Sequence, residues 1–277
     1  MRFIQPSMAK LNLSLRITGR RGDGYHNLVS LFLRLPPVEA LLIAKSQDGR
    51  DSVRTWGLEF EGENVVTRAL RHAREEGLEV PFLDVEIFKT LCPGSGLGAG
   101  SGNAAAVLRW LAGSAGASAW WNAALKTGAD VPFLFSELPV ALVSGVGEVL
   151  EPLEPLEGIF VTVAFPRWVT GTENAYERLD RWYGNTYPLN EAAARTEAEV
   201  LYQRLRAGES VGLLPNDFMP CLMANFLEYR ALFELFDKSG YTAWGVTGSG
   251  AAVFALSFKP LTTSWPPSIQ RVLSVPV

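Results

Sequence analysis

The sequence predicts an α+β protein that is divided into two domains. Apolar residues recur at every second position in some segments and with helical spacing in others. The two kinds of segment interleave without strict alternation, which favours α+β over a doubly wound parallel sheet. An acidic run with regularly spaced prolines, residues 151–157, separates the halves, so we place the domains at residues 1–152 and 153–277.

The first half begins with a strand over residues 9–17, where leucine or isoleucine stands at alternate positions. Asn64 is placed to cap a helix that Gly77 ends. Further strands are expected at 31–44, 52–60 and 83–89, with two or three short ones within 131–150. Further helices are expected from 101 or 102 to 111 and at 118–126.

The second half is expected to begin with a strand over residues 159–165 and a short helix after Thr172. A longer helix over 190–207 is ended by Gly208. The other expected elements are a helix over 220–239 and two strands, 243–247 and 251–257, that flank a glycine turn. The end, 259–277, is rich in proline.

The composition limits the classes of function. The chain has 277 residues, of which 48% are hydrophobic, enough to bury a substantial core. Its net charge of −4 and the lack of a long basic run argue against nucleic acid as a partner. No segment reaches about 18 apolar residues, so we expect a cytoplasmic protein outside the membrane. We expect no disulfide between Cys92 and Cys221.

The most informative segment is the glycine-rich stretch 92–106, which follows the strand expected at 83–89. Glycine lets the backbone approach a ligand closely, and a loop that opens a helix offers N–H groups to an anion such as phosphate. A flexible surface loop is the alternative, and the flanking strand and helix argue against it.

Three kinds of nucleotide loop can be compared with this stretch. A P-loop ends in Gly-Lys-Ser/Thr, and no lysine stands at that place here. A dinucleotide fingerprint is matched by Gly94, Gly96 and Ala99, but the acidic residue required about 20 positions later is missing. The third kind, a phosphate loop with the pattern Gly-Leu-Gly-x-Gly-Ser-x-Asn-Ala, matches closely.

Three polar residues outside the loop are candidates for chemistry. Lys10 and Asn12 lie two residues apart on the first strand and so share one face of it, although such a pair taken alone forms a solvated face. Asp130 follows a predicted helix and precedes an apolar segment, where a carboxylate needs a partner. It is either a helix cap or a catalytic carboxylate paired with a lysine.

Two turns carry further candidates. In the turn at 23–28, Tyr25 could stack on a base or sugar, and His26 could hydrogen-bond through either ring nitrogen. A plain turn with a half-buried tyrosine is the alternative. Thr247 and Gly248 open a second glycine turn, which either approaches a phosphate or the first loop, or is a tight hairpin.

Six segments in this order along the chain resemble one enzyme family. They are residues 9–13, 23–26, 96–105, 128–132, 216–218 and 248–250. The glycine segment resembles the phosphate loop of the GHMP small-molecule kinases. Asp-Gly-Tyr-His at 23–26 is similar to one family among them, the 4-diphosphocytidyl-2-C-methyl-D-erythritol kinases.

The resemblance implies a two-domain GHMP kinase fold with the nucleotide and the substrate in a cleft between the domains. It implies phosphorylation by ATP of the 2-hydroxyl of the methylerythritol unit, in non-mevalonate isoprenoid biosynthesis. The partner would be this small molecule, and the chain is expected to be a monomer or a homodimer.

The resemblance also assigns roles to residues. Lys10 and Asp130 match the catalytic pair: Asp130 would orient or accept the hydroxyl proton, and Lys10 would keep it ionised and stabilise the transferring phosphoryl group. Ser101 is the candidate hydroxyl for Mg²⁺ that bridges the ATP phosphates. The expected phosphate loop comprises Pro93, Gly94, Ser95, Gly96, Leu97, Gly98, Ala99, Gly100, Ser101 and Gly102. The expected substrate-binding residues are Asn12, Tyr25, His26, Tyr176, Thr247 and Gly248.

Some positions depart from the family pattern. Gly102 stands where a second serine is usual, so one phosphate or metal contact would pass to backbone or water. Ala99 replaces a glycine, which requires a negative φ at this position. Cys92 stands where the proline that opens the loop is usual.

Two alternatives stay open at this point. The first is another GHMP kinase that acts on a different small alcohol, and Tyr25 and His26 argue against it. The second is a nucleotide-binding protein with weak or no catalysis, which the missing serine favours. Retention of both Lys10 and Asp130 argues against the second alternative.

Overall fold

A computed structural model describes residues 1–58, 62–113, 117–168, 170–184 and 186–277. The chain forms two compact units. Unit 1 comprises Met1–Lys10, Arg34–Pro93 and Gly98–Leu138, and unit 2 comprises Leu11–Leu33, Gly94–Leu97 and Pro139–Val277. The domain boundary between 152 and 153 stays a prediction, and these units follow a different division. The reason is that strands from the first half share a core with a helix from the second half, as described below.

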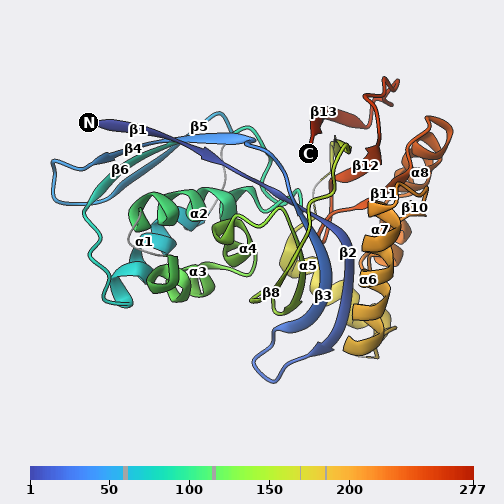
Figure 1. Cartoon of the computed structure of the whole chain (residues 1–277), viewed down its shortest axis with the longest axis horizontal. Coiled ribbons are helices and arrows are strands. Elements are labelled where there is room, and N and C mark those ends of the chain that lie inside the picture. Colours follow the sequence, from blue (N-terminus) through green and yellow to red (C-terminus); the bar gives the residue numbers. More distant parts are fainter. Residues whose placement is uncertain (59–61, 114–116, 169, 185) are drawn as a thin grey trace. The chain divides into compact units, whose positions relative to one another are not determined.

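A four-stranded sheet forms one layer of unit 1, with the order β1-β4-β6-β5 (Figure 1). Its strands are β1 (Arg2–Ser7), β4 (Glu39–Lys45), β5 (Ser52–Trp56) and β6 (Leu83–Phe88). Strand β5 is parallel to β6, and the other pairs are antiparallel. The end of the strand expected at 52–60 lies partly outside the described residues.

Helices cover one face of this sheet. Alternate apolar residues of β4 and β6 pack against α1 (Val65–Glu75) and α2 (Ala99–Ala112). Each fully buried side chain of this size contributes about 1.5–3 kcal/mol, so this cluster holds α2 on the sheet. Its members include Leu41, Ile43, Leu70, Val85, Ile87 and Val107. Asn64 caps α1 as expected, because its side chain accepts a hydrogen bond from the Val66 N–H.

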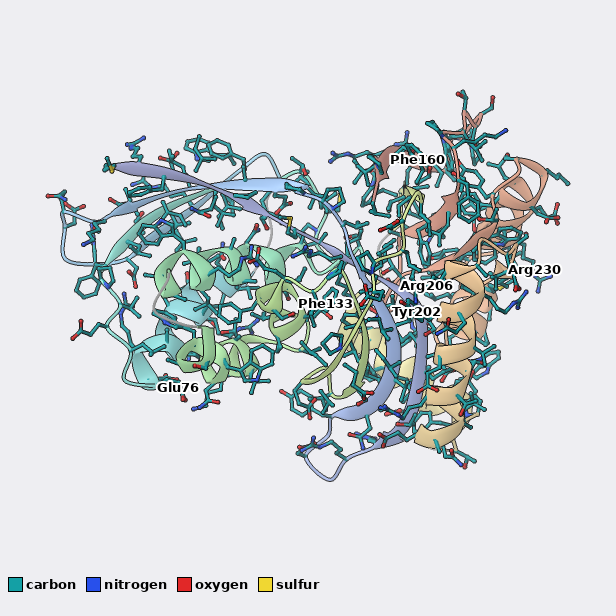
Figure 2. The ribbon with its side chains drawn as sticks, viewed as in Figure 1. Glu76, Phe133, Phe160, Tyr202, Arg206 and Arg230 are labelled. Carbon is teal, nitrogen blue, oxygen red and sulfur yellow. The ribbon has the colours of Figure 1, made fainter. Side chains whose placement is uncertain are left out.

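The remaining helices of unit 1 are a 3₁₀ turn (Ala117–Trp120), α3 (Trp121–Thr127) and α4 (Val131–Ser136). Figure 2 labels Glu76, which ion-pairs with Lys126 of α3, and Phe133 of α4, which is fully buried. Of the two or three short strands expected within 131–150, two are present, β7 (Val140–Gly145) and β8 (Val149–Leu153), whereas the start of this range forms α4. All five residues from 131 to 135 are buried. A short run of apolar residues has no periodicity that distinguishes a buried helix from a buried strand.

The first sheet of unit 2 has the order β2-β3-β7-β8. Its strands are β2 (Lys10–Arg20), β3 (His26–Arg34), β7 (Val140–Gly145) and β8 (Val149–Leu153). Val29 and Leu142 of this sheet pack against Ala194 and Ala198 of α6 (Glu191–Arg206). On the same helix the Tyr202 hydroxyl, labelled in Figure 2, donates to the Glu154 carbonyl oxygen at 3.0 Å. Helix α6 thus joins a sheet whose strands all precede residue 154.

The second sheet of unit 2 has the order β10-β11-β12-β9-β13. Its strands are β9 (Phe160–Pro166), β10 (Gly212–Leu213), β11 (Ala243–Val246), β12 (Val253–Ser257) and β13 (Ile269–Pro276). The helices that follow β9 in unit 2 also include α5 (Thr172–Tyr183), α7 (Met219–Asn225) and α8 (Glu228–Lys238). Among the helices that the structure describes, none has the length and apolar character needed to span a bilayer.

One sequence expectation for unit 2 needs correction, and one strand was not expected. The single helix expected over 220–239 is two helices, because Phe226 after α7 has an extended backbone with φ −135° and ψ 96°. The proline-rich end forms a strand, β13, that pairs antiparallel with β9.

Helix α2 approaches the backbone before β2 very closely at Gly102. A Cβ built on Gly102 would lie 1.9 Å from the Met8 carbonyl oxygen and 3.0 Å from the Ser7 hydroxyl oxygen. No larger residue fits without moving the helix or the strand. The departure from serine at this position is therefore a packing requirement of this chain.

We predict that Gly102→Ala lowers stability by about 1–3 kcal/mol, the usual cost of overpacking. The matched control is Gly100→Ala in the same helix, where the nearest atom to the new Cβ is a Val65 methyl at 3.3 Å. Because alanine favours helix over glycine by about 1 kcal/mol, the control should unfold at or slightly above the wild-type temperature. Thermal unfolding followed by circular dichroism checks this. Equal midpoints for the two variants would contradict the packing argument.

Candidate active site

The glycine loop ends at the first turn of α2. Gly98 precedes the helix with a φ of +66°, and no side chain caps the helix there. The first N–H groups of a helix have no partner within it, and with the helix dipole they favour an anion. The helix begins at Ala99, two or three residues earlier than expected, and the requirement for a negative φ at Ala99 is thereby met. Ser101 lies in this first turn and is partly exposed.

Lys10 and Asp130 lie against Gly98 in unit 1. The Lys10 Nζ atom is 3.4 Å from Asp130 Oδ2, and the two side chains are 5% and 28% exposed. A Cβ on Gly98 would lie 3.0 Å from Asp130 Oδ2 and 3.3 Å from Lys10 Cε, so glycine permits this approach. The expectation of a solvated face is wrong, because Lys10 and Asn12 are both buried. Asp130 stands at the N-cap position of α4 but makes no side-chain cap hydrogen bond, and its carboxylate pairs with Lys10. The catalytic role of this pair stays a prediction.

A buried carboxylate holds both ends of the loop. Glu39 on β4 has a fully buried side chain. Its Oε1 atom accepts from the backbone N–H groups of Thr90 and Leu91, at 3.0 and 2.9 Å. Its Oε2 atom accepts from Lys89 Nζ and Asn103 Nδ2, both at 2.9 Å. Since Leu91 precedes the loop and Asn103 follows it in α2, one side chain fixes the loop's entry and exit.

In unit 2 the second glycine turn contacts the middle of the first loop. The Thr247 hydroxyl donates to the Gly96 carbonyl oxygen at 3.2 Å and accepts from the Asn12 N–H at 3.1 Å. A Cβ on Gly96, where φ is +80°, would lie 2.1 Å from the Thr247 carbonyl oxygen. Gly248 approaches the Gly96 carbonyl in the same way, at 3.1 Å from its ideal Cβ. The turn therefore joins β11 to β12 and also supports the first loop.

The expected base-binding residues of unit 2 have different environments. The His26 side chain is 6% exposed, and its ring stacks on Tyr176 with the centroids 4.7 Å apart. Asn12 donates through its amide to the Ser30 hydroxyl at 2.9 Å. Tyr25 lies in the turn between β2 and β3 and is 64% exposed. The structure thus brings His26 and Tyr176 together and leaves the Tyr25 ring at the surface.

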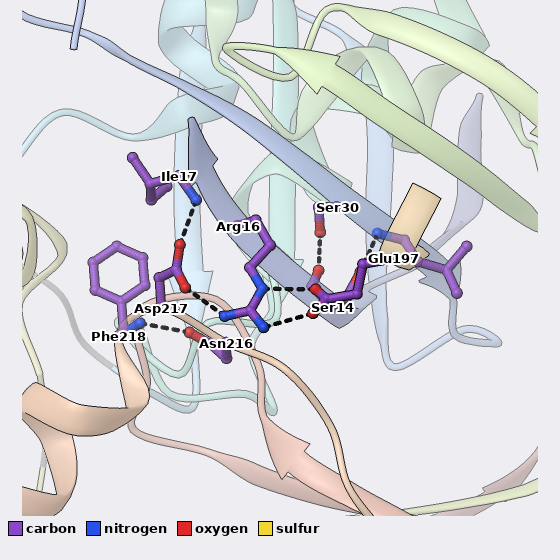
Figure 3. A network of polar contacts seen from close by, with 9 residues as sticks. Ser14, Arg16, Ile17, Ser30, Glu197, Asn216, Asp217 and Phe218 are labelled. Atoms are coloured by element: carbon purple, nitrogen blue, oxygen red, sulfur yellow. Dashed lines mark hydrogen bonds and ion pairs between the residues drawn. The ribbon is translucent and has the colours of Figure 1, made fainter. Parts of the chain in front are cut away.

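A partly buried network of hydrogen bonds fastens β2 to the rest of unit 2 (Figure 3). Arg16 donates to both carboxylate oxygens of Glu197 on α6 at 2.7 Å and to Asp217 Oδ1 at 2.6 Å. Asp217 Oδ2 accepts from the Ile17 N–H at 2.8 Å. Burial raises the pKa of Asp217, although the hydrogen bonds from Ile17 and Arg16 oppose that rise. The neighbouring Asn216 donates to the carbonyl oxygens beside the second glycine turn, so the network also positions that turn.

Comparison with known proteins agrees with this arrangement. Residues 64–134 match the GHMP kinases N terminal domain. The chain is 36% identical to the 4-diphosphocytidyl-2-C-methyl-D-erythritol kinase of Nitratidesulfovibrio vulgaris (strain DP4), over 90% of this chain and 88% of that protein. It is 33% identical to the enzyme of the same name from Thermosipho africanus (strain TCF52B), over 91% and 89%. The chain belongs to the 4-diphosphocytidyl-2-C-methyl-D-erythritol kinase family.

A solved structure supports membership in this kinase family. The crystal structure of a 4-(cytidine 5'-diphospho)-2C-methyl-D-erythritol kinase superposes with a TM-score of 0.71 at 27% identity, covering 93% of this chain and 90% of that one. The mixed helix-and-sheet architecture of the GHMP kinases is thereby confirmed.

Two residues near the expected site were missed in the sequence. Glu39 follows two prolines at the start of a strand, and nothing local distinguishes it from a solvated carboxylate. Asp180 contacts His26, with Oδ1 2.7 Å from Nε2. The spacing of Tyr176 and Asp180, four residues apart on α5, was a signal that both share one helix face.

We predict that Glu39→Gln destabilises the protein by about 3–5 kcal/mol, because an amide cannot replace all four acceptor contacts and the buried Lys89 ammonium loses its counter-charge. Glu86→Gln on neighbouring β6 is the control. Its carboxylate is 30% exposed and pairs with Arg2 at 3.7 Å, so a change of less than about 1 kcal/mol is expected. Chemical denaturation measures both variants. An equally small effect at both positions would show that Glu39 does not hold the loop.

Proposed function

We propose that this protein uses ATP to phosphorylate the 2-hydroxyl of 4-diphosphocytidyl-2-C-methyl-D-erythritol. The observation that carries this proposal is the contact of Gly98 with the Lys10–Asp130 pair. A carboxylate and an ammonium group stand where the phosphate loop enters a helix, which is the arrangement that phosphoryl transfer to an alcohol needs. A protein that only binds a nucleotide has no need of a base at that place.

In the proposed reaction the substrate hydroxyl oxygen forms a bond to the γ-phosphorus while the bond from that phosphorus to the β–γ bridging oxygen breaks. Asp130 accepts the hydroxyl proton, and its 28% exposure leaves the carboxylate accessible. Lys10, whose Nζ atom lies 3.4 Å from Asp130, stabilises negative charge on the transferring group. The N–H groups at the start of α2 bind phosphate oxygens. ADP leaves with the bridging oxygen.

Mg²⁺ suits the residues at this end of the loop. The hydroxyl of Ser101, in the first turn of α2, is a hard oxygen donor of the kind that Mg²⁺ prefers. When bound, the ion neutralises charge on the β- and γ-phosphates. In unit 2 we propose that Asn12, His26 and Tyr176 bind the cytidine end of the substrate. Cytoplasmic location is part of the same proposal.

We predict that ATP turnover by the wild-type protein requires 4-diphosphocytidyl-2-C-methyl-D-erythritol, and that Asp130→Asn lowers kcat by a factor of about 100 or more because the proton acceptor is lost. Asp48→Asn, at an exposed residue that follows β4 in the same unit, should leave kcat unchanged. A coupled assay of ADP release gives both values, and the thermal midpoint shows that each variant is folded.

Other results would favour the alternatives. Turnover with mevalonate or homoserine but not with the cytidyl compound would indicate another GHMP kinase. ATP binding without turnover of any of these alcohols would indicate a nucleotide-binding protein.

A further inference from the structure

His26 is held in one orientation by two residues of α5. Its ring stacks on Tyr176, with an interplanar angle of 29°, and its Nε2 atom lies 2.7 Å from Asp180 Oδ1. Tyr176 and Asp180 are four residues apart and so lie on the same face of the helix. With the side chain only 6% exposed, the imidazole has one orientation and a fixed partner for one of its nitrogens.

The surroundings of Asp180 determine whether its carboxyl group donates a hydrogen bond to His26 or accepts one from it. Asp180 Oδ1 also accepts from the Tyr187 hydroxyl at 2.6 Å, and Oδ2 lies 3.3 Å from Arg20 Nη1. Burial alone would raise the pKa of Asp180, but the hydrogen bonds from Tyr187 and His26 outweigh it and hold the pKa below its usual value. Asp180 is therefore ionised at neutral pH and can only accept hydrogen bonds. The proton at this contact must sit on His26 Nε2.

A neutral imidazole that carries its proton on Nε2 has a lone pair on Nδ1. Such an atom accepts a hydrogen bond from an amine and is repelled by a carbonyl oxygen. Cytosine has an exocyclic amine at the position where uracil has a carbonyl. An imidazole in this tautomer therefore discriminates between the two bases, because it accepts a hydrogen bond from the amine of cytosine and is repelled by the carbonyl oxygen of uracil.

We propose that Asp180 is a positioning residue that fixes the Nε2-protonated tautomer of His26, so that Nδ1 selects the exocyclic amine of cytosine. Asp180 acts through His26 and does not touch the base. This inference rests on the proposed function, because the cytidyl group comes from there. It adds the residue that makes the base subsite selective for cytidine over uridine.

The first experiment reads the tautomer directly, without substrate or turnover. The chain has two histidines, so a long-range ¹H–¹⁵N spectrum of the full-length protein at pH 7.5 contains two imidazoles. His72→Gln assigns them, since His72 lies on α1 beside Glu75. We expect His26 to be neutral with its proton on Nε2 in the wild type, and to lose this single tautomer in Asp180→Ala. A charged His26, or a proton on Nδ1, in the wild type would overturn the proposal.

The second experiment measures selectivity. Binding of 4-diphosphocytidyl-2-C-methyl-D-erythritol and of its uridine analogue is compared by calorimetry, with a non-hydrolysable ATP analogue filling the nucleotide site. We expect Asp180→Ala to reduce the preference for cytidine about tenfold, the scale of one lost hydrogen bond. The control is Glu177→Gln on the same helix, where the carboxylate is exposed and pairs with Arg181. The control should keep the wild-type preference.

The outcomes separate this inference from the function on which it rests. If the wild type does not bind the cytidyl compound, the proposed function fails. If the wild type binds it and Asp180→Ala keeps the full preference, the proposed function stands and the role of Asp180 is refuted. Should Asp180→Ala not fold, Asp180→Asn takes its place. The amide of asparagine can donate as well as accept a hydrogen bond, so Asp180→Asn is expected to reduce the preference for cytidine less than Asp180→Ala does.

Discussion

The buried carboxylate of Glu39 is the constraint on which the glycine loop depends. A run of glycines has no strong preference for one conformation and loses much entropy when it is ordered. Glu39 compensates by binding the backbone before the loop and Asn103 after it. The Lys89 ammonium offsets the cost of burying this charge. The contacts of Glu39 thus link β4 to the residues that follow β6 and to α2.

The elements that could be predicted from the sequence are those with a strong repeating pattern and a local cap. Strand β2 and helices α1 and α6 were expected with nearly correct bounds, because apolar spacing, the cap at Asn64 and the terminating glycines Gly77 and Gly208 mark them. Strands β1 and β13 were missed because few of their residues are buried, so no alternation of polar and apolar residues shows in the sequence. Helix α4 is buried from Val131 to Phe135 and has no polar face to reveal its period.

The residues of the candidate site fall into the same two groups, those that a local sequence pattern marks and those that it does not. The loop, Lys10 and Asp130 are marked by short local motifs, and the structure places them in contact. Glu39 and Asp180 act through partners that lie 64 and 154 residues away in the chain. Their roles depend on which helix face is turned toward which strand, a property of tertiary packing that local spacing does not encode.

Segments of unit 1 lie between segments of unit 2 along the chain, and this order has a consequence for synthesis on the ribosome. Strand β3 pairs with β7, and their contact of Leu33 with Val140 spans roughly a hundred residues. At about 5–20 residues per second, β3 waits on the order of 5–20 s for its partner while all the intervening segments of unit 1 emerge. During that time an apolar strand edge is exposed to other chains. A nascent chain of this kind is a natural client for chaperones that shield strand edges until the partner strand appears.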